Sequence, residues 1–118
     1  MHHNYEKLTV YQDSLSLAKT IYRLTKGLKC FVLVDQITGS NISIPSNIAE
    51  GSQRSSKRDF LKFLSYSKGS SAELLTQLRI LQEEAEVKDQ NYLATIISDC
   101  EVLNSRLHAF INHINKTS

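Results

Sequence analysis

The chain has 118 residues, of which 41% are hydrophobic and 22% are charged, as is typical of one globular domain with a single core. It contains only four glycines and one proline, too few for the closely spaced turns of a β-sandwich or barrel. The glycines lie too far apart in the sequence to form a phosphate-binding loop. Composition therefore excludes loop-rich folds and nucleotide-loop enzymes.

Charge is distributed unevenly along the chain. The net charge is +2, but residues 54–79 carry six Lys and Arg against two acids, and residues 80–101 carry six acids against one Lys. This asymmetry permits an anionic partner at the basic segment, or self-association between unlike surfaces. No segment is apolar and long enough to span a membrane, and no leader pattern is found, so we expect a cytoplasmic protein with no membrane partner.

The first helix is predicted over residues 10–26. Gly27 follows it, as expected of a residue whose left-handed conformation closes a helix. Helical periodicity places the apolar residues in one stripe, with a second stripe beside it. The first stripe is Tyr11, Leu15, Ala18 and Tyr22, and the second is Leu17, Ile21 and Leu24.

The second helix is predicted over residues 31–50. Pro45 interrupts it, because proline lacks an N–H and crowds the carbonyl of Asn41. We therefore expect one bent helix or two pieces, with Gly51 as the stop. The apolar face is expected to contain Cys30, Val34, Ile37, Asn41, Ile44 and Ile48.

The third helix is predicted over residues 57–84, beginning at a Ser56–Asp59 capping box. Its core positions alternate in steps of four and three. Small residues fill its middle, so another helix can approach closely, and the Ser- and Asn-rich part of the second helix is the expected neighbour. The predicted core positions are Phe60, Leu64, Ser67, Ser71, Leu74, Leu78, Leu81 and Ala85.

The fourth helix is predicted over residues 89–116, with the same alternation at Leu93, Ile96, Cys100, Leu103, Leu107, Phe110 and Ile114. Short connections favour neighbouring helices that run antiparallel. The sequence thus predicts an all-α fold: an antiparallel up-and-down four-helix bundle with a proline-bent second helix, forming a single domain over residues 1–118.

Two helices carry more apolar residues than one core stripe requires. They are Phe60, Leu61, Phe63 and Leu64 on the third helix and Tyr92, Leu93, Ile96 and Ile97 on the fourth. Faces this wide suggest that apolar surface is buried against another subunit. The alternative is a monomer with a few exposed apolar residues.

The sequence contains no convincing catalytic or metal-binding pattern. His108 and His113 lie five residues apart on different faces of a helix, and neither follows a Glu by three residues, as a di-iron bundle requires. The acids Glu83, Glu84 and Glu86 are expected to form a solvated helix end. We therefore expect no enzyme activity, no metal and no cofactor.

The candidate binding residues are four cations at the start of the third helix: Arg54, Lys57, Arg58 and Lys62. Cations in a first turn oppose the helix dipole. Together with free backbone N–H groups, they can hold phosphate, so they form a candidate nucleic-acid site. Ordinary solvated surface charge is the alternative reading. Glu50 is placed to pair with Arg54 across the turn.

Several motifs carry a family resemblance: Asp35-Gln36-Ile37, the run 43–51 (SIPSNIAEG), the run 54–64 (RSSKRDFLKFL), Gly69-Ser70, Ala72-Glu73-Leu74 and Thr76-Gln77-Leu78. The chain resembles the bacterial four-helix bundle proteins encoded in intervening sequences of 23S ribosomal RNA genes. The resemblance implies a homopentamer without enzymatic activity. The family is also similar to the accessory protein of diversity-generating retroelements, a basic pentamer that binds nucleic acid and a reverse transcriptase.

Two departures from the family pattern bear on function. Thr38 and Gly39 stand where relatives often carry bases, and Leu75 stands where an acid is common. The first hypothesis is a homo-oligomeric bundle that binds structured RNA or DNA through the four cations. The second is a protein-interaction scaffold without nucleic-acid activity, whose partner is a protein encoded nearby.

Overall fold

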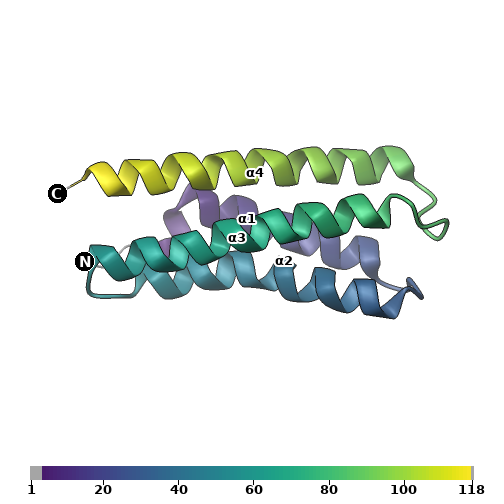
Figure 1. Ribbon diagram of the computed structural model, residues 1–118, viewed down its shortest axis with the longest axis horizontal. Coiled ribbons are helices and arrows are strands. Elements are labelled where there is room, and N and C mark those ends of the chain that lie inside the picture. Colours follow the sequence, from purple (N-terminus) through teal and green to yellow (C-terminus); the bar gives the residue numbers. More distant parts are fainter. Residues whose placement is uncertain (1–3, 118) are drawn as a thin grey trace.

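The computed structural model describes residues 4–117, and its regular elements are helices (Figure 1). Met1–His3 and Ser118, which the single-domain prediction includes, lie outside the described residues. The elements are η1, a short 3-10 helix (Tyr5–Lys7), then α1 (Thr9–Thr25), α2 (Phe31–Ser52), α3 (Lys57–Leu81) and α4 (Gln90–Lys116). The prediction of an all-α fold with four long helices is confirmed.

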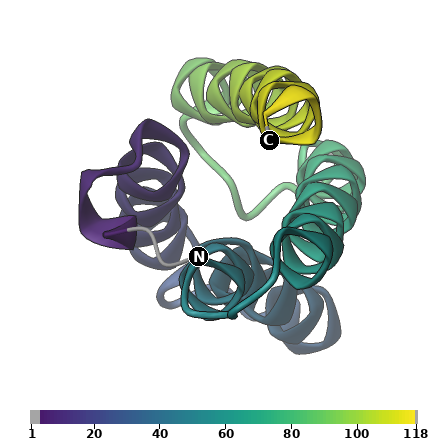
Figure 2. The same ribbon diagram turned by 90° about the vertical axis from the view of Figure 1, so that its left-hand side faces the viewer.

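The four long helices surround a common centre when the molecule is viewed end-on (Figure 2). The bundle is elongated, measuring 49 × 21 × 20 Å. The α1–α2 and α3–α4 connections lie at one end, and the α2–α3 connection lies at the other, beside the C-terminus (Figure 1). The start of α3 is therefore next to the end of α4.

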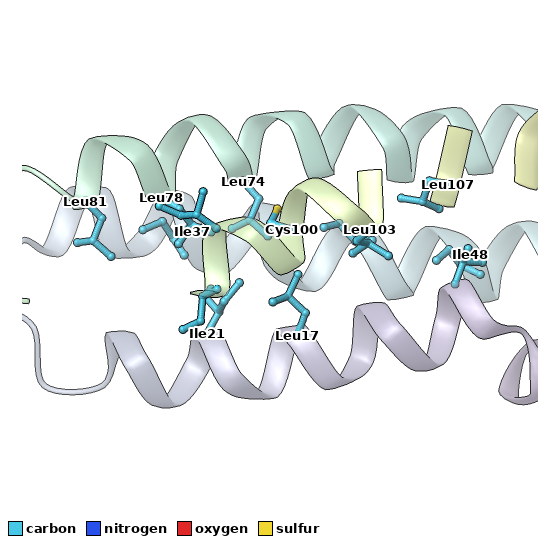
Figure 3. Close-up of a cluster of buried hydrophobic side chains, with 14 of the residues drawn as sticks. Leu17, Ile21, Ile37, Ile48, Leu74, Leu78, Leu81, Cys100, Leu103 and Leu107 are labelled. Carbon is cyan, nitrogen blue, oxygen red and sulfur yellow. The ribbon is translucent and has the colours of Figure 1, made fainter. Parts of the chain in front are cut away.

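Side chains from all four helices meet in one apolar core (Figure 3). Fully burying one Leu or Ile side chain contributes about 1.5–3 kcal/mol. The core positions predicted for the third helix are buried up to Leu81, and those predicted for the fourth are buried except Phe110, which is half-buried. Ala85 is exposed, because α3 has already ended at Leu81.

The buried face of α1 follows the second of the two predicted stripes more closely than the first. Its buried residues are Val10, Ser14, Leu17, Ile21 and Thr25, whereas Tyr22 is 60% exposed. Ser14 and Thr25 tolerate burial because their hydroxyls donate to backbone carbonyls one turn earlier, at 2.9 and 3.1 Å. Gly27 has φ +88°, so its predicted role in closing this helix is confirmed.

The second helix continues through Pro45 to Ser52 as a single element. The alternative of two helical pieces is therefore wrong, and the bend at Pro45 stays a prediction. Gly51 was expected to stop the helix, but it lies inside the last turn without a positive φ.

Gly51 instead permits the close approach of α2 and α3. A Cβ atom added to Gly51 would lie 2.6 Å from Cβ of Phe63 and 3.1 Å from Cδ1 of Phe60. Real Cβ atoms essentially never come within 3.0 Å of such an atom. A residue with a side chain would therefore force these two helices apart at this end of the bundle.

Small polar residues occupy the middle of the α2–α3 contact, as predicted. The hydroxyl of Ser67 donates to the carbonyl of Ile44 at 2.8 Å, and the hydroxyls of Ser43 and Ser70 are 2.8 Å apart. Between α3 and α4, the Asn104 amide donates to the hydroxyl of Ser71 at 2.6 Å. These bonds satisfy polar groups between helices that pack closely.

Glu86, in the α3–α4 connection, binds to the α1–α2 connection at the same end of the bundle. Its carboxylate accepts hydrogen bonds from the backbone N–H groups of Lys29, at 2.5 Å, and Cys30, at 3.0 Å. These donors, at the start of α2, have no partner within the helix. Glu86 was expected to belong to a solvated helix end, so its role as a link between connections was missed.

We expect Glu86→Gln to lower stability at neutral pH and to weaken its acid dependence. The hydrogen bond from the Lys29 backbone, the largest effect, holds the pKa of Glu86 below its ordinary value of 4.5. The ionised Glu86 carboxylate therefore stabilises the folded protein fully above pH 4.5. This stabilisation is lost as the pH falls toward the lower pKa of Glu86 in the folded state. Urea unfolding at several pH values measures this, with the exposed Glu83→Gln as the control. If the stability of both variants depends on pH to the same extent, the Glu86 carboxylate does not stabilise the two connections.

Candidate nucleic-acid interface

The start of α3 is capped as predicted. Ser56 has extended backbone angles, and its hydroxyl accepts a hydrogen bond from the N–H of Asp59 at 3.1 Å. The Asp59 carboxylate lies in the first turn, where it interacts favourably with the helix dipole. It partly offsets the cost of placing Lys57 and Arg58 in the same turn.

Arg54 lies in the α2–α3 connection and has two partners. Its Nη2 atom is 2.6 Å from Oε1 of Glu50, which confirms the predicted pair. Its guanidinium carbon also lies 4.7 Å from the centre of the Phe63 ring. The Arg54 side chain remains 43% exposed, so the pair contributes at most about 1 kcal/mol and leaves this cation accessible.

Lys62 lies near the same aromatic ring. Its Nζ atom is 5.7 Å from the centre of the Phe63 ring, and the rings of Phe63 and Tyr66 meet edge to face with centres 5.5 Å apart. Arg58, one turn before Lys62, is exposed. We call Arg54, Arg58, Lys62, Phe63 and Tyr66 the α3 patch.

Lys57 is positioned differently from the other three predicted cations. Its ammonium donates to the backbone carbonyl of Asn115 at 3.0 Å and also to that of Thr117. These carbonyls lie at the C-terminal end of α4, where the helix dipole favours a cation. Lys57 thus links the start of α3 to the end of α4.

The aromatic members of the patch were not predicted as site residues. Phe63 was assigned to an apolar face only. Tyr66 follows Lys62 by four residues, as Lys62 follows Arg58, so these three residues share one outward face of α3. The alternation of bases and aromatic residues over positions 58–66 is the signal that could have identified them, since such alternation is typical of nucleic-acid surfaces. The contact of Arg54 with Phe63 depends on the path of the α2–α3 turn, and no local sequence pattern predicts it.

A second notable surface is an open groove between α1 and α2, with a volume of about 880 Å³. Three large apolar side chains that line it are exposed: Tyr22 by 60%, Phe31 by 69% and Ile42 by 56%. Three exposed cations also line it: Lys19 and Arg23 of α1, and Lys26 directly after α1. We call this surface the α1–α2 groove.

A smaller apolar surface lies on the other side of α2, against α3. Phe31 contributes to it as well, together with the exposed Val32 and Ile80, and Glu84 also lines it. We call it the α2–α3 face. The α1–α2 groove is thus bordered by cations, whereas the α2–α3 face has an acid.

The wide apolar faces predicted on the third and fourth helices are largely used inside the monomer. Phe60, Leu64, Leu93, Ile96 and Ile97 are buried. Leu61 and Phe63 are half-buried, and Tyr92 is 43% exposed. The apolar surface that the described residues leave uncovered is concentrated around α2 instead.

Over residues 4–117, no three His, Cys, Asp or Glu side chains are grouped so that they could hold a metal ion.

Lys68 and His108 form an exposed contact, with Nζ and Nδ1 2.9 Å apart. Burial is the main reason that the pKa of the Cys100 thiol rises to about 12. In the same part of the chain, no helix is both apolar and long enough to span a membrane.

The fold and the α3 patch define a helical bundle with a small cationic and aromatic surface at the α2–α3 end. Residues 6–109 match the family described as 23S rRNA-intervening sequence protein. The chain belongs to this family, and the resemblance seen in the sequence is confirmed.

One solved structure with the same fold is a protein of unknown function from the S23 ribosomal protein family of Bacteroides thetaiotaomicron VPI-5482. The two chains are 28% identical and superpose with a TM-score of 0.80, over 92% of this chain and 100% of the other. No curated protein matches the chain.

Proposed function

We propose that this protein is a non-enzymatic, homo-oligomeric helical bundle that binds structured RNA or another nucleic acid through the α3 patch. The main support for the proposal is that Arg54 and Lys62 lie against the Phe63 ring, which meets the Tyr66 ring edge to face. Arg58 is a third exposed cation, one turn before Lys62 on the same helix. Cations neutralise phosphates and release counterions, which drives binding with little dependence on sequence.

The four predicted cations do not contribute equally in this proposal. Arg54, Arg58 and Lys62 contact phosphates, whereas the Lys57 ammonium is engaged by the carbonyls at the end of α4. Lys57 therefore serves as a matched control, because Lys57→Gln removes the same charge from the same helix start.

Replacing Arg58 or Lys62 by Gln should weaken RNA binding and reduce its dependence on salt. Each lost phosphate contact lowers the slope of log K against log salt by about one. Fluorescence anisotropy with a labelled RNA hairpin over a range of salt concentrations measures the slope. Lys57→Gln should leave the slope unchanged. If all the variants have the wild-type slope, the α3 patch is not the binding site.

Self-association is the second part of the proposal. Lys19, Arg23 and Lys26 line the α1–α2 groove and Glu84 lines the α2–α3 face, so unlike charges would face each other if these surfaces of two copies met. A contact between unlike faces of identical chains builds a ring when the rotation closes. We propose a closed ring of this kind, with five copies as the family resemblance implies.

The alternative function is a protein-interaction scaffold without nucleic-acid activity. The α1–α2 groove favours it, since Tyr22, Phe31 and Ile42 offer apolar contacts to a protein segment. Thr38, which also lines the groove, replaces a base common in relatives. Failure of the wild-type protein to bind RNA at low salt would favour this alternative.

A further inference from the structure

The Phe63 ring organises the α3 patch but offers little of its own surface. It is half-buried, and it has Arg54 on its face, Lys62 nearby and the Tyr66 ring against it. A Cβ on Gly51 would lie 2.6 Å from Cβ of Phe63, so this side chain is also packed tightly against α2. Phe63 is therefore a fixed support for the groups around it.

Tyr66 differs from Phe63 because it remains 50% exposed. It lies in a row with Arg58 and Lys62, each four residues from the next, so the row advances about 6 Å per step along α3. Its contact with Phe63 restricts the orientation of the ring. The arrangement is an oriented aromatic group at the end of a line of cations.

An exposed ring next to cations matches the chemistry of single-stranded nucleic acids. Unpaired bases present their faces and stack on aromatic side chains, while nearby cations hold the flanking phosphates. In a duplex the bases are already stacked on one another, so a surface ring reaches only the backbone or a groove. A cationic surface without a ring would bind both forms through phosphates alone.

We infer that the α3 patch recognises unpaired segments of RNA or DNA, with one base stacked on Tyr66 and the adjoining phosphates held by Arg58 and Lys62. This inference rests on the proposed function, because it names the form of nucleic acid bound at the same site. For a structured RNA, it predicts contact at loops, bulges and ends.

Tryptophan substitution provides a direct readout, because the chain contains no tryptophan. Tyr66→Trp places a single indole in the patch, and stacking with a base should quench its fluorescence. The probes are a short single-stranded RNA of mixed sequence and the same strand annealed to its complement. Tyr92→Trp, at an exposed tyrosine near the start of α4, is the matched control and should show no quenching.

Affinity measurements with the same probes complete the test. Tyr66→Ala should weaken single-strand binding about tenfold and leave duplex binding nearly unchanged, whereas Tyr66→Phe should retain single-strand affinity. Arg58→Gln should weaken binding to both probes. Circular dichroism of each variant verifies that the helices are retained.

The outcomes separate this inference from the proposed function. Quenching by the single strand, together with a selective loss in Tyr66→Ala, supports both. If the protein binds the two probes equally and Tyr66→Ala has no effect, the inference is wrong while the proposed function stands. If neither probe binds to the wild-type protein at low salt, the proposed function fails and the inference fails with it.

Discussion

Gly51→Ala is expected to destabilise the protein by about 1–3 kcal/mol, although alanine is the better helix former. The new Cβ would meet Cβ of Phe63 at 2.6 Å and Cδ1 of Phe60 at 3.1 Å. The Cβ of Phe63 is fixed to its backbone, so rotation of the ring cannot relieve the contact. The helices α2 and α3 must separate, and the buried Phe60 loses packing.

Gly39→Ala is the matched control for this prediction, because Gly39 lies in the same helix. A Cβ at Gly39 meets no atom within 4 Å, so the substitution should stabilise the protein by about 0.5–1 kcal/mol through helix propensity. Urea unfolding followed by circular dichroism at one protein concentration compares the two variants. If both substitutions change the free energy of unfolding in the same direction, Gly51 does not set the distance between α2 and α3.

Phe31→Glu is expected to abolish self-association while leaving the monomer folded. Phe31 is 69% exposed and lines both the α1–α2 groove and the α2–α3 face. In the proposed contact between copies, a carboxylate at position 31 would lose its water, whether the chain contributes its groove or its α2–α3 face. The free-energy cost of this desolvation exceeds what a small interface contributes. Light scattering after size exclusion should give the mass of one chain for this variant and a multiple of that mass for the wild type.

Val102→Glu is the control for Phe31→Glu. Val102 lies on α4, is 45% exposed and belongs to neither apolar surface around α2. Its replacement should leave the mass unchanged. A wild-type protein that is monomeric at micromolar concentration, or a Phe31→Glu variant that keeps the wild-type mass, would contradict the proposed contact between copies.

The periodicity of apolar residues was sufficient to predict the third and fourth helices and their buried faces. In these helices, one face carries nearly all the core residues, including Leu74 and Leu103. In α1 the periodicity gave two adjacent stripes without distinguishing the buried one. It included the exposed Tyr22 and omitted the buried Ser14. A serine or threonine can be buried in a helix when its hydroxyl bonds to the preceding turn, and periodicity does not detect this.

The candidate site was only partly predictable for a similar reason. The cations could be located because they are close in sequence, and the Glu50–Arg54 pair spans four residues. The roles of Lys57 and Gly51 depend on which helix packs beside them. Lys57 contacts the end of α4, 58 residues away along the chain, and a local pattern carries no information about such a contact.

Binding of nucleic acid through cations can be measured on the wild-type protein itself. The measurement is fluorescence anisotropy with a labelled structured RNA, titrated at low and at near-physiological salt. We expect micromolar or tighter binding at low salt that weakens steeply as salt is raised. Absence of binding at low salt, or binding that is insensitive to salt, would contradict it.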